Sequence, residues 1–478
     1  MAYIPTIGLE VHVQLNTQTK IFCNCKTSFG DPPNTNVCPI CLALPGALPV
    51  FNEKVLHKAV EAAIALNCKV HPYSRFDRKN YFYPDLPKAY QITQFEFPYC
   101  TEGYIEINKS ETEQKKITIT RIHMEEDAGK LIHSEDSSIL ESYVDLNRAG
   151  TPLIEIVSDP VIDNADEAVL YLDKLKSILQ YINVSDCNME EGSLRVDANV
   201  SIRPAGTEQL GTRAEIKNVN SFKAVKAAIE YEIKRQTELL ESGKKVVQET
   251  RLWNATYGQT ESMRSKEEAH DYRYFPDPDL VTIHLLDSKL KELRENLPEL
   301  AHQKQKRFVE EYGIPLYDAA LLTASRKTSE YFENVIEHGA PAKKASNWIM
   351  SEMMAISSEK VCDLTEIFSP QYLAELIKQI ESGAISGKIA KEVFQDMVES
   401  GKSPGQIIKD KGLLQIVDLS EIEKYVLEVI QENQESVESF KNGKDRAFGH
   451  LVGQVMKKSK GKANPELVNK LLKEKIVV

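Results

Sequence analysis

The spacing of apolar residues changes near residue 290, and this change constrains the fold more than any other feature of the sequence. Before it, apolar and polar residues alternate in runs such as Leu194–Arg203, which is the period of a half-buried strand. After it, runs such as Phe308–Tyr312 and Tyr331–Ile336 have helical spacing. Strands followed by helices are typical of an α+β protein. We therefore predict a sheet-based first part and a helical remainder.

Length and charge narrow the class of protein further. The 478 residues suggest about three domains. The sequence has no signal peptide and no apolar run of about 18–20 residues, so we expect a cytoplasmic protein that does not enter a membrane. The net charge of -12 argues against extensive coating of nucleic acid, but it leaves room for a local basic patch.

The stretch Thr120–Lys130 places three carboxylates and an imidazole within five residues, at the end of a predicted strand. They are His123, Glu125, Glu126 and Asp127. Carboxylates this close repel one another unless they are solvated, meet cations or hold a hard divalent metal. From this stretch alone, a solvated acidic turn and a metal site both remain open.

A second candidate lies on the first predicted strand, Leu9–Leu15. Glu10 and His12 share one face of it, because side chains two apart in a strand point the same way. Together they can ligate a metal or form an acid–base pair. An exposed polar face is the alternative. Further along, Asp145 and Glu155 add acidic side chains in an apolar setting.

Four of the eight cysteines form two short pairs, Cys23-x-Cys25 and Cys38-x-x-Cys41. In a reducing compartment such pairs indicate a zinc knuckle, because Zn²⁺ takes four tetrahedral ligands. With all four positions filled, the zinc would be structural. Four buried or incidental thiols are the alternative.

Residues 75–91 are basic, aromatic and interrupted by proline, so we expect an irregular loop. Four cations beside aromatic rings can hold phosphates and a nucleobase or ribose: Arg75, Arg78, Lys79 and Lys88. A solvated loop with its rings packed inward is the alternative. Residues 270–280 repeat this mixture, and we expect them to form another wall of the same cleft.

The strand at 194–203 has an entirely polar second face that includes Arg195. Such a face is either the solvated side of a sheet or the floor of a polar cleft. Good N-cap residues predict helices elsewhere in this part of the chain. The expected helices run from Asn52 to about Leu66, from Asn164 to about Ile182 and from Ser221 to near Gly243.

The last 75 or so residues are predicted to form a small helical unit after a weak boundary at 400–405. From Lys441 onward there are ten Lys or Arg and three Asp or Glu. Four lysines cluster before a helix that begins near Pro465: Lys457, Lys458, Lys460 and Lys462. A positive patch on an acidic protein suggests contact with phosphates of nucleic acid. An ordinary lysine-rich surface is the alternative.

The sequence lacks a P-loop, a Rossmann glycine turn and a Gly-x-Ser-x-Gly elbow, so a nucleotide site would need another architecture. Six segments nevertheless form a long, ordered series: 7–13, 76–85, 121–130, 145–156, 189–199 and 271–279. They resemble the B-subunit family of GatCAB, the aspartyl/glutamyl-tRNA(Asn/Gln) amidotransferase. Residues 454–466 also look like that family's tail domain, which is similar to the YqeY fold.

The resemblance implies a fold and a domain plan. Residues 1–292 would form a cradle-shaped catalytic domain with a mixed or antiparallel sheet, in which the zinc knuckle occupies 23–41. Residues 293–402 would form a helical domain, and 403–478 a YqeY-like tail that contacts tRNA.

It also implies an activity. With ATP, such a protein phosphorylates the side-chain carboxylate of mischarged Glu-tRNA(Gln) or Asp-tRNA(Asn), and ammonia then displaces the phosphate. The ammonia comes from glutamine through the amidase (A) component of the GatCAB heterotrimer, which the small (C) component completes. This chain lacks the Gly-Gly-Ser-Ser of amidases, which fits that division of labour.

By the same resemblance, Mg²⁺ would be bound by Glu10, His12, Glu125 and Glu155. Glu125, Lys79 and Glu10 would be catalytic, and Arg78, Lys88 and Arg195 would bind the nucleotide. Arg78 and Lys79 would hold phosphate or line the ammonia path. His12 is an unusual ligand for Mg²⁺, which leaves Mn²⁺ or an outer-shell role open. The four knuckle cysteines match the zinc-bearing branch, and the four tail lysines would contact tRNA.

Two other functions remain open at this point. The chain could be a non-catalytic tRNA-binding scaffold, in which case Glu10 and Glu125 would be dispensable for chemistry. It could also be a stand-alone ligase, but glutamine-dependent activity would then require a glutaminase that the sequence does not contain.

Overall fold

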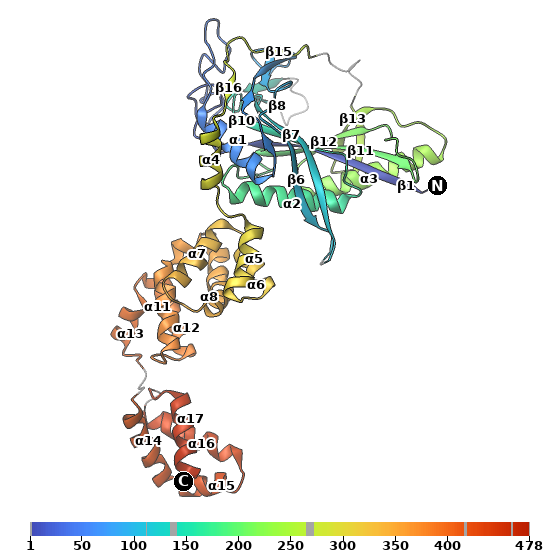
Figure 1. Cartoon of the computed structure of the whole chain (residues 1–478). Coiled ribbons are helices and arrows are strands. Elements are labelled where there is room, and N and C mark those ends of the chain that lie inside the picture. The colour runs from blue at the N-terminus through green and yellow to red at the C-terminus, as the bar shows by residue number, and fades with distance from the viewer. Residues whose placement is uncertain are drawn as a thin grey trace. The chain divides into compact units, whose positions relative to one another are not determined.

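The computed structural model describes residues 2–110, 112–133, 141–263, 272–414, 418–459 and 462–477 (Figure 1). They form two compact units, Met1–Leu300 and Ala301–Val478. All strands of the described residues lie in the first unit, and the second is helical. This confirms the predicted α+β class.

The first unit is built on a mixed sheet of nine strands within the described residues. Neighbouring strands are antiparallel except for one parallel pair, β12 with β13. In spatial order the strands are β14 (Gln259–Ser262), β13 (Glu249–Asn254), β12 (Ala214–Val219), β11 (Leu194–Pro204), β1 (Tyr3–Gln14), β10 (Pro152–Ser158), β7 (Gln114–Glu126), β6 (Cys100–Asn108) and β2 (Lys69–Val70).

One face of this sheet carries the main hydrophobic core. Alternate residues of β1, from Ile7 to Val13, are fully buried there. Helices α2 (Ala165–Tyr181) and α3 (Phe222–Glu241) lie along this face, and α1 (Glu53–Ala65) belongs to the same core (Figure 1). The side chains of Asn52, Asn164 and Ser221 accept hydrogen bonds from the first turns of these helices, which confirms the three predicted N-caps.

The other face carries polar side chains and is bordered by smaller elements. A three-stranded sheet has the order β15 (Phe275–Pro276), β4 (Asp77–Asn80) and β5 (Tyr90–Thr93). Two further pairs are β16 (Ile283–His284) with β3 (Tyr73–Ser74), and β8 (Lys130–His133) with β9 (Ser142–Asp145). Helix α4 (Asp287–Asn296) ends the unit and packs on α1.

The prediction of an irregular loop at 75–91 is partly wrong, because β4 and β5 lie within it. Phe275 on β15 pairs with Arg78, almost 200 residues away in sequence, and β5 pairs with the other edge of β4. Long-range pairing therefore overrides the local signal. The two prolines, Pro84 and Pro87, lie between the strands, where they cost no ladder hydrogen bonds.

The second unit contains two separate hydrophobic cores among its described residues. The first runs from Phe308 to Ile408, and the second from Ile422 to Ile476. Helix α13 (Pro404–Lys411) contributes Ile407 and Ile408 to the first core, although the expected tail begins at residue 403. The division into three domains stays a prediction.

The helices of the first core are α5 (Ala301–Tyr312), α6 (Leu316–Leu322), α7 (Arg326–Glu337), α8 (Ala342–Trp348), a π-helical segment (Ile349–Met353), α9 (Met354–Lys360), α10 (Leu364–Ile367), α11 (Pro370–Glu381), α12 (Gly387–Ser400) and α13 (Pro404–Lys411). Those of the second are α14 (Leu419–Glu432), α15 (Gln434–Lys441), α16 (Asp445–Lys458) and α17 (Pro465–Val477), the last of which confirms the helix predicted near Pro465. No described helix has the length and apolar character needed to cross a membrane.

Candidate functional site

A row of charged side chains crosses four neighbouring strands on the polar face of the large sheet. His123 on β7 pairs with Glu155 on β10, Glu155 with His12 on β1, and His12 with Arg195 on β11. The strand period of two places all four on the face opposite the helices, because their sequence neighbours are core residues. The polar face of β11 is therefore part of the floor of this site.

Glu155 lies between the two imidazoles, and Glu125 lies beside them. The Glu155 carboxylate is 3.2 Å from His12 Nε2 and 3.5 Å from His123 Nε2. Glu125 is 3.9 Å from His12 Nε2 and 3.7 Å from His123 Nε2. Glu10 reaches the same His12 nitrogen at 3.7 Å. The four residues expected to bind metal are thus brought together.

Two residues in this group were missing from the expected ligand set. His123 shares a strand face with Glu125, so the same alternation that selected Glu125 could have selected it. Asp197 lies on β11 within 4.8 Å of Glu10 and His12, measured between candidate ligand atoms. Its selection required the pairing of β1 with β11, which a single sequence does not specify.

The charges of this cluster stabilise one another. Burial raises the pKa of Glu155, but the two histidines outweigh it and hold that pKa well below its ordinary value. Burial lowers the pKa of His123, yet Glu155 and Glu125 raise it overall to about 9. The pKa of His12 is raised by the same two carboxylates, despite burial. Burial and the charge of Glu155 raise the pKa of Glu10.

The donor set fits a divalent cation. His12, Glu125 and Glu155 offer ligand atoms that all lie within 4.8 Å of one another. Carboxylate oxygens suit Mg²⁺ and Mn²⁺, whereas an imidazole nitrogen favours Mn²⁺ over Mg²⁺.

The three acidic residues of the central stretch are buried and point to different partners. Glu125 and Glu126 are 3% exposed and Asp127 is 4% exposed, so a solvated acidic turn is excluded. Glu125 accepts a hydrogen bond from Thr93 Oγ1 at 3.2 Å, next to the histidines. Glu126 pairs with Lys88. One stretch therefore supplies three distinct contacts.

Asp127 fixes the position of Arg195. Its carboxylate accepts hydrogen bonds from Arg195 Nη2 at 3.0 Å and from Gln14 Nε2 at 2.8 Å. Burial raises the pKa of Asp127, but Arg195 and Arg148 outweigh it, and the pKa lies below its ordinary value. Arg195 is thereby held at the end of the histidine–glutamate row.

Lys79, on β4, faces the same cluster from the smaller sheet. Burial lowers its pKa, but the charges of Glu125, Tyr274 and Glu155 raise it above the ordinary value. Its ammonium is 4.9 Å from the ring centre of Tyr272. A lysine held charged beside Glu125 can neutralise negative charge brought by a substrate.

The other two cations expected at a nucleotide, Arg78 and Lys88, flank Tyr90. Arg78 lies 4.2 Å from the centre of that ring and Lys88 5.7 Å from it. Arg78 also donates to Asp277 at 2.9 Å. The described part of residues 270–280 thus packs against β4, as predicted for a wall of the cleft.

The four knuckle cysteines converge in space. Their sulfur atoms all lie within 4.8 Å of one another, and the Sγ atoms of Cys38 and Cys41 are 3.9 Å apart. Four thiolates about 2.3 Å from a tetrahedral zinc would be about 3.8 Å apart. A hydrogen bond from Cys23 lowers the pKa of Cys41 to about 4, whereas the pKa of Cys23 is raised by that hydrogen bond and by burial, and burial raises the pKa of Cys25 to about 11. Zinc binding would therefore have to displace protons from these two thiols. The four residues fit a zinc ion.

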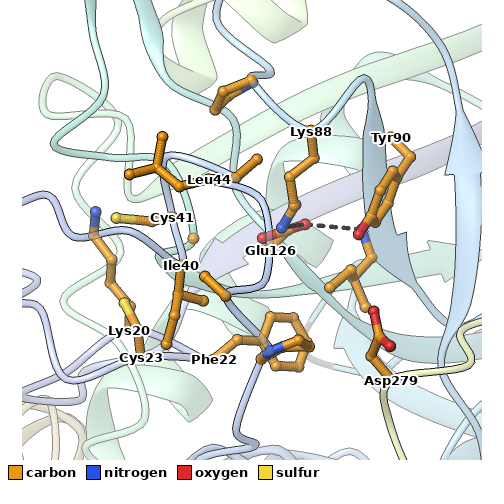
Figure 2. Close-up of a pocket in the computed structure, with 16 residues that line it drawn as sticks. Lys20, Phe22, Cys23, Ile40, Cys41, Leu44, Lys88, Tyr90, Glu126 and Asp279 are labelled. Atoms are coloured by element: carbon orange, nitrogen blue, oxygen red, sulfur yellow. Dashed lines mark hydrogen bonds and ion pairs between the residues drawn. The ribbon is translucent and has the colours of Figure 1, made fainter.

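A cavity of about 220 Å³ lies between this cysteine cluster and the Lys88–Glu126 pair (Figure 2). Its lining includes Lys20, Phe22 and Tyr90. Glu126 lines this cavity, whereas its chain neighbour Glu125 belongs to the carboxylate–histidine cluster.

The tail lysines lie in the second unit. Lys457 and Lys462 are exposed, whereas Lys458 pairs with Glu428 at 2.8 Å and with Glu432 at 2.6 Å. Lys460 lies outside the described residues.

Comparisons with known proteins identify the family of the chain. Residues 5–291 match the family described as "GatB/GatE catalytic domain", and residues 330–476 match the "GatB domain". Over 478 residues and the full length of both chains, the sequence is 55% identical to the B subunit of the aspartyl/glutamyl-tRNA(Asn/Gln) amidotransferase from Thermoanaerobacter pseudethanolicus. The protein of the same name from Leptospira biflexa is 55% identical over 478 residues, which cover 100% of this chain and 98% of that one. This chain therefore belongs to the GatB family.

Proposed function

We propose that this chain is the subunit of a tRNA-dependent amidotransferase that phosphorylates and then amidates the aminoacyl group. Its substrates would be Glu-tRNA(Gln) or Asp-tRNA(Asn), with ATP as phosphoryl donor. The observation that carries the proposal is the buried cluster of Glu155, Glu125 and His12 facing the charged Lys79. The names of the relatives support the same substrates.

The reaction has two steps whose atoms balance. A side-chain carboxylate oxygen of the aminoacyl-tRNA bonds to the γ-phosphorus of ATP, and the bond from that phosphorus to ADP breaks. Ammonia then attacks the acyl carbon of the resulting acyl phosphate. The bond from the acyl carbon to the phosphate oxygen breaks, the proton lost by the nitrogen passes to the departing phosphate, which leaves as hydrogen phosphate, and a side-chain amide remains. In both steps negative charge lies on the phosphate oxygens, so the site mainly needs cations that are held in fixed positions beside them.

The residues that would hold Mg²⁺ are Glu10, His12, Glu125 and Glu155. When bound, the ion neutralises phosphate charge and orients the transferred group. Glu155 keeps both imidazoles in place through contacts of 3.2 and 3.5 Å. The fixed cluster then needs little rearrangement when phosphate arrives.

Lys79 would stabilise the phosphoryl oxygens, and Arg195 would do so from the opposite end of the row. Burial strengthens both interactions, because water screens them less. Arg78 and Lys88 would contact the nucleotide or line the path of ammonia near Tyr90, since both cations flank that ring.

We further propose the partners and the second metal. The amidase (A) component of the heterotrimer would release ammonia from glutamine, and the small (C) component would complete the assembly. The four-cysteine cluster would bind structural zinc. Lys457, Lys458, Lys460 and Lys462 in the tail would contact tRNA phosphates, with a cytoplasmic location for the whole complex.

The test compares two nitrogen donors in the assembled complex. We expect Glu10→Gln and Glu125→Gln to lose amidation with either glutamine or ammonium, while tRNA binding and the amidase's glutamine hydrolysis persist. Glu106→Gln, an exposed carboxylate on β6, is the control and should retain amidation. If both site variants amidate like the wild type, the chain is a tRNA-binding scaffold and the proposal is wrong.

A further inference from the structure

The loop between the two cysteine pairs is hydrogen-bonded to a turn more than 100 residues away in sequence. The backbone N–H of Asn34 donates to Asp145 Oδ1 at 3.1 Å, and that of Leu146 donates to Asn34 Oδ1 at 2.8 Å. The N–H of Asn36 donates to Asn147 Oδ1 at 2.8 Å. The cysteine loop therefore determines the position of residues 144–147.

Lys20 joins the same two segments from inside the protein. It is 0% exposed, and its ammonium donates to Asn36 O at 2.7 Å and to Leu146 O at 3.3 Å. No carboxylate lies in ion-pair distance of it within the described residues. A buried ammonium with carbonyl partners alone is costly, so it requires negative charge nearby.

The cysteine cluster can supply that charge. Lys20, Cys23 and Cys41 line the same cavity (Figure 2), and the charge of Lys20 helps to lower the pKa of the Cys41 thiol. Gly150, at φ +84°, packs against both: a Cβ there would lie 3.5 Å from Lys20 Cδ and 3.8 Å from Cys41 Cβ. Four thiolates around Zn²⁺ carry a net charge of about -2, which a single ammonium offsets in part.

The turn held by Lys20 is hydrogen-bonded to the backbone of Asp127, the residue whose carboxylate pairs with Arg195. The N–H of Ile21 donates to Gly150 O at 3.0 Å, and the N–H of Gly150 donates to Asp127 O at 2.9 Å. The N–H of Asp127 in turn donates to Thr151 O at 2.8 Å. The N–H of Lys20 donates to Cys25 O at 3.0 Å, so backbone hydrogen bonds link the first cysteine pair, through the adjacent Lys20 and Ile21, to Gly150 and Asp127.

We propose that Lys20 is a positioning residue that couples zinc binding at the four cysteines to the placement of Arg195 in the carboxylate–histidine site. Its ammonium balances the thiolates and pins the turn at 144–151. The turn fixes Asp127, and Asp127 holds Arg195. Loss of zinc or of the ammonium loosens this turn and displaces Arg195.

The test uses the assembled, zinc-loaded complex with Lys20→Met, which keeps the length of the side chain but removes its charge. Lys26→Met, an exposed lysine between the two cysteine pairs, is the matched control. We expect Lys20→Met to release zinc to a chromophoric chelator about tenfold faster, the usual effect of removing an outer-shell partner. Amide hydrogen exchange at 144–151 should accelerate in Lys20→Met, and Lys26→Met should match the wild type in both measurements.

A double-mutant cycle separates positioning from general damage. The activity arm rests on the proposed function, whereas zinc release and hydrogen exchange do not. We expect Lys20→Met to lower kcat for amidation with KM for Glu-tRNA unchanged. In an Arg195→Met background, the same change should lower kcat no further, because the residue it acts through is gone.

Three results would overturn the inference. The first is zinc release from Lys20→Met at the wild-type rate. The second is a loss of kcat caused by Lys20→Met that is as large in the Arg195→Met background as in the wild type. The third applies even if Lys20→Met does not fold: removal of zinc from the wild-type complex with a chelator should accelerate exchange at 144–151, and unchanged exchange there would exclude the coupling.

Discussion

Glu155 contacts two imidazoles at once, and this arrangement would make the proposed binding of a metal at this cluster depend on pH. The pKa of His123 is about 9, and that of His12 is also raised, because Glu155 and Glu125 favour the protonated rings. A metal ligand must be neutral imidazole, and a bound cation disfavours the second imidazolium as well. Protons therefore compete with the metal.

We predict that the affinity of the site for Mn²⁺ rises with pH between about 6.5 and 9 and then levels off. The sign follows from the raised pKa values, since protonated histidines prevail below them. Electron paramagnetic resonance of free Mn²⁺, titrated against the complex at several pH values, measures this. An affinity that is constant across that range would contradict the assignment.

In the proposed mechanism, Lys79 would neutralise negative charge on the transferred phosphoryl group. We expect Lys79→Met to lower kcat by about 10²-fold, the usual effect of removing one fixed donor from a site of developing charge. The dissociation constant for Glu-tRNA should stay unchanged. Steady-state amidation and a filter-binding assay measure the two quantities, with exposed Lys69→Met as the control. A change in tRNA affinity alone would remove Lys79 from the chemistry.

At the scale of single residues, the alternation of strands was enough to predict that Glu10 and His12 share a face, and the cysteine spacing predicted the cluster. Strand alternation was not enough to predict the different partners of Glu125, Glu126 and Asp127. Lys88, which pairs with Glu126, and Arg195, which pairs with Asp127, come from other parts of the chain. Burial of all three carboxylates depends on those partners, and a single sequence does not show which segments will be neighbours.

At the scale of elements, helix α2 is attached to β7 by a buried carboxylate. Glu167 accepts from Lys115 Nζ at 2.6 Å and from the N–H of Asp163 at 3.0 Å. Burial raises the pKa of Glu167, but these hydrogen bonds outweigh it, so the pKa lies below the ordinary 4.5. A carboxylate whose pKa is lower in the folded state than in the unfolded chain stabilises the folded state at any pH above its pKa in the unfolded chain. This stabilisation is lost as the pH falls through the pKa of the folded state.

We predict that Glu167→Gln destabilises the first unit by about 1.5–3 kcal/mol at pH 7, the range for hydrogen bonds to a charged group. The difference from wild type should shrink as the pH falls below about 4.5. Urea unfolding, followed by a probe in the first unit, measures it at each pH. The exposed Asp166→Asn in the same turn should have a smaller effect. A difference independent of pH would exclude the charge of Glu167 as its cause.

Regular elements with strong local signals were predictable, and those that depend on distant partners were not. Helices α1, α2 and α3 have side-chain caps and apolar stripes, so their positions follow from local sequence. Strands β4 and β5 are short and lie in a proline-containing, aromatic segment. They form because β15 supplies an edge from almost 200 residues away.

At the scale of the whole molecule, the change of periodicity near residue 290 correctly predicted where the strands end. It did not predict that the helical unit has two cores, with α13 in the first, because helical spacing is the same in both. The helices of the second core, α14 to α17, include Lys457 and Lys458 at the end of α16, two of the lysines expected to contact tRNA.

We predict unequal contributions from the tail lysines. Lys457→Ala with Lys462→Ala should weaken tRNA binding and reduce the slope of log affinity against log salt by about 0.7–0.9 per lost phosphate contact. Lys458→Ala should have a smaller effect, because Lys458 is already paired with Glu428 and Glu432. Binding titrations at several salt concentrations measure both. Equal losses for Lys458 and for the exposed pair would contradict this ranking.

The central claim is that phosphoryl transfer occurs at the carboxylate–histidine cluster on the polar face of the large sheet. The most direct measurement is transfer of the labelled γ-phosphate of ATP to Glu-tRNA in the assembled complex, by rapid quench, with glutamine and ammonium withheld. We predict label on tRNA with the wild type and with Glu106→Gln, and none with Glu125→Gln at equal tRNA occupancy. Labelling of Glu125→Gln at the wild-type level would place the chemistry elsewhere.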